Sequence, residues 1–232
     1  MPEFSIVQKI AIWVLPVLCA IILHEVAHGW VAEKLGDPTA RMLGRLTLNP
    51  IKHIDPVGTI LMPAVLLLLT RGSFMFGYAK PVPIGVRNFK NMRRDMAIVG
   101  AAGPAANLCM AFTWCLAVRA GPLLQGVTPN LALPVMLIGV AGIYINVMLM
   151  ILNLIPIPPL DGGRVLSGLL PKRWALTYDR LEPWGFLIVG LLLITRVLAP
   201  IIVFPLSIII YYLAHLAGLS FDGFQMLLSV LT

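Results

Sequence analysis

Residues 10–32 read IAIWVLPVLCAIILHEVAHGWVA, an apolar run that is interrupted only by His24, Glu25 and His28. A helix needs about 20 mostly apolar residues to cross the hydrocarbon core of a bilayer, and this run is long enough. It lacks the basic start and the small-residue cleavage site of a signal peptide. We therefore predict a retained first membrane helix, which ends at the break Gly36-Asp37-Pro38.

The composition of the whole chain is typical of a membrane protein. Of its 232 residues, 59% are hydrophobic and only 12% are charged, whereas about a quarter of the residues of a soluble domain are charged. The formal net charge is +7, but the basic residues are scattered in short loops, as in the cytoplasmic loops of membrane proteins. We therefore expect a lipid bilayer as a partner, in the cell membrane, and no nucleic acid.

Further apolar stretches predict a multi-pass bundle. Residues 96–118 and 131–155 are uncharged and long enough to span. Residues 183–219 contain one charged residue, Arg196, and have room for two more spans. We predict an all-α membrane protein, a helical bundle of about five to six spans that forms a single domain over residues 1–232, with a core at 10–170 and accessory spans at 183–219.

The basic residues also predict an orientation. Segments 36–55 and 87–94 are both basic, so both are expected on the cytoplasmic side. The piece between them then crosses an even number of times, and its apolar part, residues 56–70, is short for one full span. We predict a re-entrant hairpin or β element between the first two core spans. The basic loop 161–182 is expected on the same side, with the N-terminus outside.

The segment His24-Glu25-Val26-Ala27-His28 fits the pattern H-E-x-x-H. Positions four apart share one face of a helix, so both imidazoles can reach one zinc ion, and Glu25 can act as general base on a water that the zinc activates. The alternative is a set of ordinary, hydrogen-bonded core residues. However, an ionised acidic or basic group in a span costs about 2.5–3.5 kcal/mol, so three ionisable residues in one span favour a functional site.

A catalytic zinc ion takes a third protein ligand and keeps one position open, and Asp161 is the best candidate for that ligand. It follows Asn153-Leu154-Ile155-Pro156-Ile157-Pro158-Pro159-Leu160, whose prolines prevent a regular helix. Irregular backbone at membrane depth is tolerated where it lines a protein-enclosed or watery cavity. The orientation above brings Asp161 to the side on which the histidines lie. The alternative is an ordinary helix end with Asp161 as a loop acid.

Two asparagines are further candidates. Asn153 precedes the proline break and can donate to an oxyanion or hold the substrate backbone, or else make a hydrogen bond between helices. Asn107 follows Gly103-Pro104, whose small residues favour close packing against the first span. We expect mainly a packing role for Asn107, with substrate binding as its other role. His53 and His215 are interpreted as a loop histidine and as a buried histidine near Tyr211 or Tyr212.

These motifs, in this order and at these separations, resemble the site-2 protease family of intramembrane zinc metalloproteases. The resemblance covers about residues 15–170 and implies one zinc ion held by His24, His28 and Asp161, Glu25 as catalytic base, and Asn153 as a substrate-binding or oxyanion residue. It also implies a membrane re-entrant β element, to which residues 73–86 are similar. The chain has no room for a PDZ or CBS domain and so resembles the compact prokaryotic branch. The motifs that carry the resemblance are His24-Glu25-x-x-His28, Gly103-Pro104-x-x-Asn107 and Asn153-x-x-Pro156-x-Pro158-x-Leu160-Asp161-Gly162.

The resulting hypothesis is an intramembrane zinc metalloprotease that cleaves transmembrane or membrane-anchored proteins, with its active site toward the cytoplasm. Two other hypotheses use the same residues: a transporter or sensor of zinc, and a non-catalytic membrane scaffold that retains the site. Further polar residues along a path across the bilayer would favour the transporter. The sequence does not identify the substrate, the cleavage position or the oligomeric state.

Overall fold

A computed structural model describes residues 4–62, 65, 68 and 79–231. All regular structure in these residues is helical, and none of them forms a β-strand. The α-helices are α1 (Ile6–Lys34), α2 (Thr39–Met42), α4 (Met92–Leu124), α5 (Pro129–Leu154), α6 (Asp161–Leu169), α7 (Lys172–Tyr178), α8 (Gly185–Ile194), α9 (Leu198–Leu216) and α10 (Phe221–Ser229). The shorter helical turns are η1 (Pro50–His53), η2 (Pro56–Leu61), η3 (Val86–Asn88) and η4 (Asp179–Trp184), of which η2 is a π-helix and the others are 3₁₀-helices.

The all-α membrane architecture that the sequence predicts is confirmed. Within the described residues, α1, α4, α5 and α9 are long and apolar enough to cross a membrane. These four are fewer than the five to six expected, because the stretch predicted to hold two spans folds into α9 and the ten-residue α8. A helix of that length is about 15 Å long, half the thickness of the hydrocarbon core. Arg196, whose φ is 60°, lies in the turn between α8 and α9.

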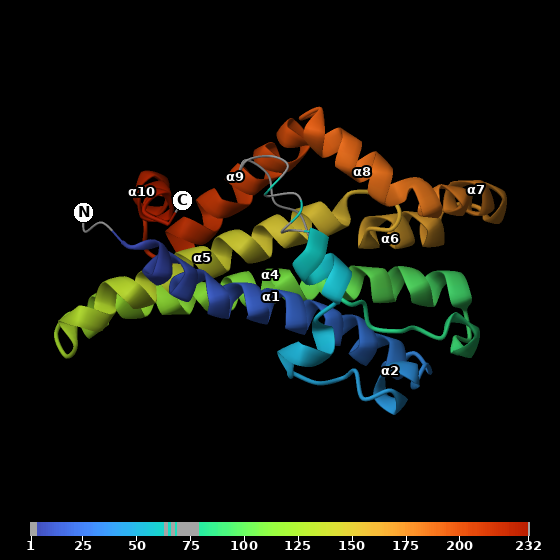
Figure 1. Ribbon diagram of the computed structural model, residues 1–232, viewed down its shortest axis with the longest axis horizontal. Coiled ribbons are helices and arrows are strands. Elements are labelled where there is room, and N and C mark those ends of the chain that lie inside the picture. The colour runs from blue at the N-terminus through green and yellow to red at the C-terminus, as the bar shows by residue number, and fades with distance from the viewer. Residues whose placement is uncertain (1–3, 63–64, 66–67, 69–78, 232) are drawn as a thin grey trace.

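Helix α5 forms the centre of the bundle. Of the 18 residues in its most apolar stretch, 56% are buried in the protein. The corresponding stretches are 22% buried in α1 and 33% buried in α4 and α9. It packs closely on α4 because Gly142 has no side chain, and a Cβ there would clash with the ring of Trp114. Figure 1 shows α1, α4 and α5 lying side by side, with α6 against the end of α4 where that helix begins.

Local signals account for both ends of α1. The Ser5 hydroxyl accepts a hydrogen bond from the backbone N–H of Gln8, and the Gln8 side chain accepts one from the backbone N–H of Ser5. This capping box satisfies donors that the first turn leaves free. The chain leaves the helix at Gly36, whose φ of 107° suits glycine. The whole H-E-x-x-H pattern therefore lies inside one continuous helix.

The segment between α1 and α4 is the part where the expected β element was placed. Residues 73–78 of that element lie outside the described residues. Residues 79–85 are irregular and belong to no strand, and η3 follows them. The re-entrant β element is therefore not confirmed by the described part of the chain.

Candidate metal centre

Three side chains that the sequence analysis singled out as metal ligands meet in the structure. His24 and His28 lie one turn apart on α1, and Asp161 is the first residue of α6. The Nε2 atoms of the two imidazoles are 3.0 Å apart, and they lie 3.0 Å and 3.1 Å from Oδ2 of Asp161. All three side chains are buried. Their ligand atoms are close enough together to hold one metal ion.

Helix α4 orients both imidazoles. The Nδ1–H of His24 donates to Oδ1 of Asn107 at 2.6 Å, and the Nδ1–H of His28 donates to the backbone carbonyl of Val99 at 2.7 Å. Each acceptor favours the tautomer with its proton on Nδ1, so Nε2 of each ring presents a lone pair toward Asp161. This pairing of a ligand imidazole with an acceptor behind it is the usual arrangement around a metal.

The donor arrangement fits a zinc ion. Two lone pairs and a carboxylate oxygen that converge on one point repel each other unless a cation lies between them. In a tetrahedral site with bonds of about 2.0–2.1 Å the ligand atoms are about 3.3 Å apart, close to the separations of 3.0 Å and 3.1 Å here. Gly103 keeps the space open, because a Cβ there would lie 2.6 Å from Nε2 of His24. Two imidazoles and one carboxylate are a ligand set of catalytic zinc, which keeps a fourth position for water.

The irregular segment after α5 delivers Asp161 to the site. Helix α5 ends at Leu154, and α6 begins only at Asp161. The turn back is tight, because a Cβ on Gly162 would clash with the carbonyl of Leu154. Nη1 of Arg164 lies 3.5 Å from Oδ1 of Asp161, the oxygen that faces away from the imidazoles. The carboxylate is thus held from both sides.

Glu25 lies beside the cluster rather than inside it. Its side chain is half-buried, and Oε2 accepts a hydrogen bond of 2.8 Å from the backbone N–H of Val82. Arg45 holds the two residues before Val82. Its Nη2 donates to the backbone carbonyl of Lys80 at 2.8 Å and to that of Pro81 at 3.3 Å. The hydrogen bond to Oε2 leaves the other oxygen of Glu25 able to accept a proton.

Asp37 holds the far end of the same segment. Its carboxylate accepts hydrogen bonds from the backbone N–H of Gly85 at 2.6 Å, from Nδ2 of Asn88 at 2.7 Å, and from the hydroxyl and backbone N–H of Thr39. Burial raises the pKa of this carboxyl, but these hydrogen bonds outweigh it and keep the pKa below its usual value. The ionised form of Asp37 therefore connects the end of α1 to residues 85–88.

The two asparagines occupy different surroundings. Asn107 is fully buried, and besides accepting from His24 it donates to the carbonyl of Ala20 at 3.2 Å and to Oδ1 of Asn146 at 2.9 Å. Its position therefore suits orientation of His24. Asn146 was not predicted from the sequence, because nothing local marks its amide as a partner of Asn107. Asn153 donates to the carbonyl of Leu149 in its own helix, and no hydrogen bond found in the described residues joins it to the cluster.

The remaining histidines lie outside the cluster. His53 is buried and its Nε2–H donates to the carbonyl of Thr47 at 2.9 Å. His215 packs on the ring of Tyr211, as expected, and donates from Nδ1 to that residue's carbonyl at 2.8 Å. The expectation that His215 is buried is wrong, because it lies on an exposed part of α9. Neither residue is close enough to join the three ligands in one metal site.

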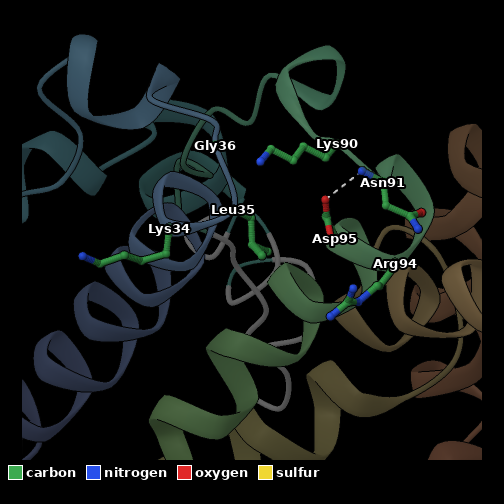
Figure 2. Close-up of a pocket in the computed structure, with 7 residues that line it drawn as sticks. All are labelled: Lys34, Leu35, Gly36, Lys90, Asn91, Arg94 and Asp95. Carbon is green, nitrogen blue, oxygen red and sulfur yellow. Dashed lines mark hydrogen bonds between the residues drawn. The ribbon is translucent and has the colours of Figure 1, made fainter.

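A separate cavity of about 330 Å³ lies between the end of α1 and the start of α4. In Figure 2 the side chain of Lys34 points away from the other residues around it, and the carboxylate of Asp95 accepts from the backbone N–H of Asn91 at 3.0 Å. The cavity contains none of the three ligands or Glu25, so we place the chemistry at the buried cluster. Its lining residues are Lys34, Leu35, Gly36, Lys90, Asn91, Arg94 and Asp95.

Comparisons with known proteins agree with this site. Residues 120–195 match the model of the family described as peptidase family M50. The chain is 36% identical over 190 residues to YwhC of Bacillus subtilis, named as a candidate zinc metalloprotease, which covers 78% of this chain and 80% of that protein. It is 33% identical over 185 residues to Rip2 of Mycolicibacterium smegmatis, named in the same way, which covers 78% of this chain and 66% of that protein.

A third similar protein is archaeal. MJ0611 of Methanocaldococcus jannaschii, also named as a candidate zinc metalloprotease, is 28% identical over 180 residues, with 75% of this chain and 78% of that protein covered. No solved structure matches the chain. The matched residues of this chain include Asp161 but not the two histidines. The contacts of His24 and His28 with Asp161 are therefore what connects the matched segment to α1.

Proposed function

The chain belongs to peptidase family M50, and we propose that it is an intramembrane zinc metalloprotease that hydrolyses peptide bonds of transmembrane or membrane-anchored proteins. The observation that carries the proposal is the buried cluster of His24, His28 and Asp161 beside Glu25, built on a helix long enough to cross a membrane. Relatives that are named as zinc metalloproteases support the metal and the class of reaction.

Each residue of the cluster has a role in the proposed reaction. His24, His28 and Asp161 would hold one zinc ion, which when bound would supply Lewis-acid activation of water and of the scissile carbonyl. Glu25 takes a proton from the attacking water at Oε1, since Oε2 is engaged by the backbone N–H of Val82. The same carboxyl then delivers the proton to the leaving amine, which makes Glu25 both base and acid.

The asparagines act around this centre. We assign Asn107 to holding the Nδ1–H of His24, because its side-chain oxygen and nitrogen both have buried protein partners. Asn153 is the proposed contact for the substrate backbone or the oxyanion. Its amide now donates to the carbonyl of Leu149, a bond that it can exchange for one to a substrate at little cost.

The membrane setting determines what a substrate must do. The carbonyls of a transmembrane helix are engaged in its own hydrogen bonds, so a substrate has to unwind before a peptide bond can reach the cluster. We propose that this happens at the cytoplasmic side of the cell membrane, in regulated intramembrane proteolysis. The basic residues in the connection after α1, Arg41 and Arg45, and those in the first turn of α4, Arg93 and Arg94, support that orientation.

Zinc transport receives less support. A transport path needs polar groups across the whole bilayer. Among the described residues, the buried polar and charged side chains belong to α1, α4, α5 and α6 or to the connection between α1 and α4, and none belongs to α8, α9 or α10. The buried polar side chains deep in the spans, His24, His28, Asn107 and Asn146, are hydrogen-bonded to one another in one centre rather than spread along a path.

Glu25→Gln tests the proposed function directly. The probe is a synthetic single-span peptide with a Gly-Pro pair in its span and a fluorophore and quencher at its two ends, reconstituted with the protein in liposomes. We expect the variant to keep about one zinc ion per chain and to lose about 10²–10⁴-fold in cleavage rate, because only the proton transfer is removed. Glu33→Gln, two turns further along α1 and paired with Arg41, is the matched control. Cleavage by Glu25→Gln at the wild-type rate would refute the assignment.

A further inference from the structure

Arg45 is a buried cation without a carboxylate partner among the described residues. Only 9% of it is exposed, and its Nε–H is buried without an acceptor. Its Nη2 donates to the backbone carbonyls of Lys80 and Pro81, at 2.8 Å and 3.3 Å. Desolvating a guanidinium for two carbonyl contacts alone is unfavourable, so a negative charge is expected on the far side of these carbonyls.

That charge belongs to Glu25, and one peptide group lies between the two. The carbonyl of Pro81 accepts from Arg45, and the N–H of the same peptide, on Val82, donates to Oε2 of Glu25 at 2.8 Å. The carbonyl and N–H of a trans peptide point in opposite directions. The guanidinium and the carboxylate therefore polarise the peptide in the same sense, and each of the two hydrogen bonds strengthens the other.

The local sequence leaves Val82 as the one residue that can donate here. Pro81 and Pro83 have no N–H, so Val82 carries the only backbone donor of residues 81–83. A residue that precedes proline is restricted to extended conformations, which stiffens the backbone at Lys80 and Val82. The Val82 side chain is 5% exposed and packs over Gly29, where an added Cβ would lie 2.9 Å from its Cγ1. The donor is thus presented by a rigid and anchored segment.

We propose that Arg45 is a positioning residue for the catalytic base: through the Pro81–Val82 peptide it holds Glu25 with one oxygen engaged and the other turned to the attacking water. The inference rests on the proposed function of Glu25 but concerns a residue that touches neither the metal ligands nor a substrate. It also accounts for the burial of Arg45, whose charge is balanced by Glu25 across one peptide group. Free rotation of the glutamate side chain would otherwise reduce the fraction of molecules with the base in place.

Amide hydrogen exchange tests the geometry without any activity. In a proteolytic fragment that covers residues 80–83, only Lys80 and Val82 carry exchangeable backbone amides, and the Lys80 N–H is bonded to the carbonyl of His53 at 2.9 Å. We expect Arg45→Ala to speed exchange at Val82 about tenfold in liposome-embedded protein. Arg41→Ala is the matched control, because Arg41 lies in the same connection between α1 and α4 but is exposed and pairs with Glu33. Equal exchange in Arg45→Ala and the wild type would overturn the proposal.

Steady-state kinetics with the fluorescent single-span peptide separates positioning from substrate binding. We expect Arg45→Ala to lower kcat about 10–100-fold with KM within about threefold of wild type and zinc content unchanged. Arg45→Lys keeps a cation that reaches one carbonyl at a time and should recover part of kcat. A rise in KM alone would show instead that the segment binds substrate, and would overturn the proposal.

A second pair of variants tests the hydrogen bond on the other side of this peptide group, from Val82 to Glu25. Val82→Pro removes the N–H, whereas Val82→Ala keeps it and removes only side-chain packing, so we expect the larger loss of kcat in Val82→Pro. If Arg45 acts through this peptide, the double variant Arg45→Ala/Val82→Pro loses no more than the worse single variant. Additive losses would overturn the proposal. Failure of the proposed function would appear separately, as cleavage that survives Glu25→Gln.

Discussion

Replacing Gly103 by alanine should weaken metal binding strongly while the helical bundle stays folded. Gly103 lies on α4 opposite both imidazoles, and the hydrogen on its Cα faces the point on which their Nε2 atoms converge. Alanine suits a helix interior better than glycine, by about 1 kcal/mol. The substitution therefore stabilises α4 itself, and the steric clash of the new methyl group is with the imidazoles of the metal centre.

The size of the effect follows from the distances. A Cβ on residue 103 would lie 2.5 Å from Cε1 and 2.6 Å from Nε2 of His24, and closer still to Nε2 of His28, whereas ordinary contact begins at 3.4 Å. Nε2 of His24 would have to withdraw by about 0.8 Å. Ligand distances in a working zinc site vary by only about 0.2 Å. Removing the hydrogen-bond partner of a metal ligand lowers metal affinity about 10–100-fold. Displacing the ligands themselves should lower the affinity by more than this.

The assay is a competition titration of zinc against a chelator of known affinity, with zinc per chain measured by mass spectrometry. We expect Gly103→Ala to bind zinc at least 100-fold more weakly than the wild type, with unchanged helix content by circular dichroism. The matched control is Gly190→Ala in α8, where no heavy atom lies within 4 Å of the added Cβ. A folded Gly103→Ala protein with wild-type zinc affinity would show that the three ligands do not share one ion.

Two further predictions concern the residues that hold the site in place. Asn107→Leu removes the acceptor behind His24 and should weaken zinc binding about 10–100-fold in the same titration, while wild-type affinity would contradict the orienting role. Asp37→Asn should lower the thermal midpoint at neutral pH, because the ionised carboxylate accepts hydrogen bonds from the segment at 85–88. Since the folded state depresses the pKa of Asp37, this stabilisation is fully present above the ordinary pKa of 3.8 and is lost as the pH falls through the folded value. The difference between variant and wild type should therefore shrink below about pH 3.8, and a difference that grows on acidification would contradict it.

That His24, His28 and Asp161 meet was predictable, because the position of each depends on short-range or topological information. His24 and His28 need only the helical period, and the helix is certain from the length of its apolar run. Asp161 lies more than a hundred residues away, yet counting spans and basic loops was enough to bring it to the end of the bundle where the histidines lie. Two segments separated by an even number of spans lie on the same side of a membrane. Counting the spans therefore places Asp161 relative to the histidines, however far apart they are in the sequence.

Arg45 and Asn146 could not be found in this way because their partners are defined by tertiary structure. Arg45 binds two backbone carbonyls, which every residue possesses, so nothing in the sequence marks Lys80 and Pro81 as its acceptors. Asn146 joins the site only through Asn107. The two spans expected within residues 183–219 are one span and a short helix for a related reason, since hydropathy measures how apolar these residues are and not where the helix breaks at Arg196.

The packing of α1 on α4 explains why Asn107 contacts the histidine cluster as well as packing against the first span. The imidazoles are four residues apart on α1, and Val99, Gly103 and Asn107 repeat at the same spacing on α4. The two helices run in opposite directions, so the earlier histidine meets the later residue: His24 bonds to Asn107, and His28 bonds to Val99. Gly103 falls between them, where any side chain would enter the space of the metal. A slip of one turn would set Gly103 against His24 and break the side-chain hydrogen bond from His24 to Asn107, so this bond favours the observed helix register as well as the tautomer.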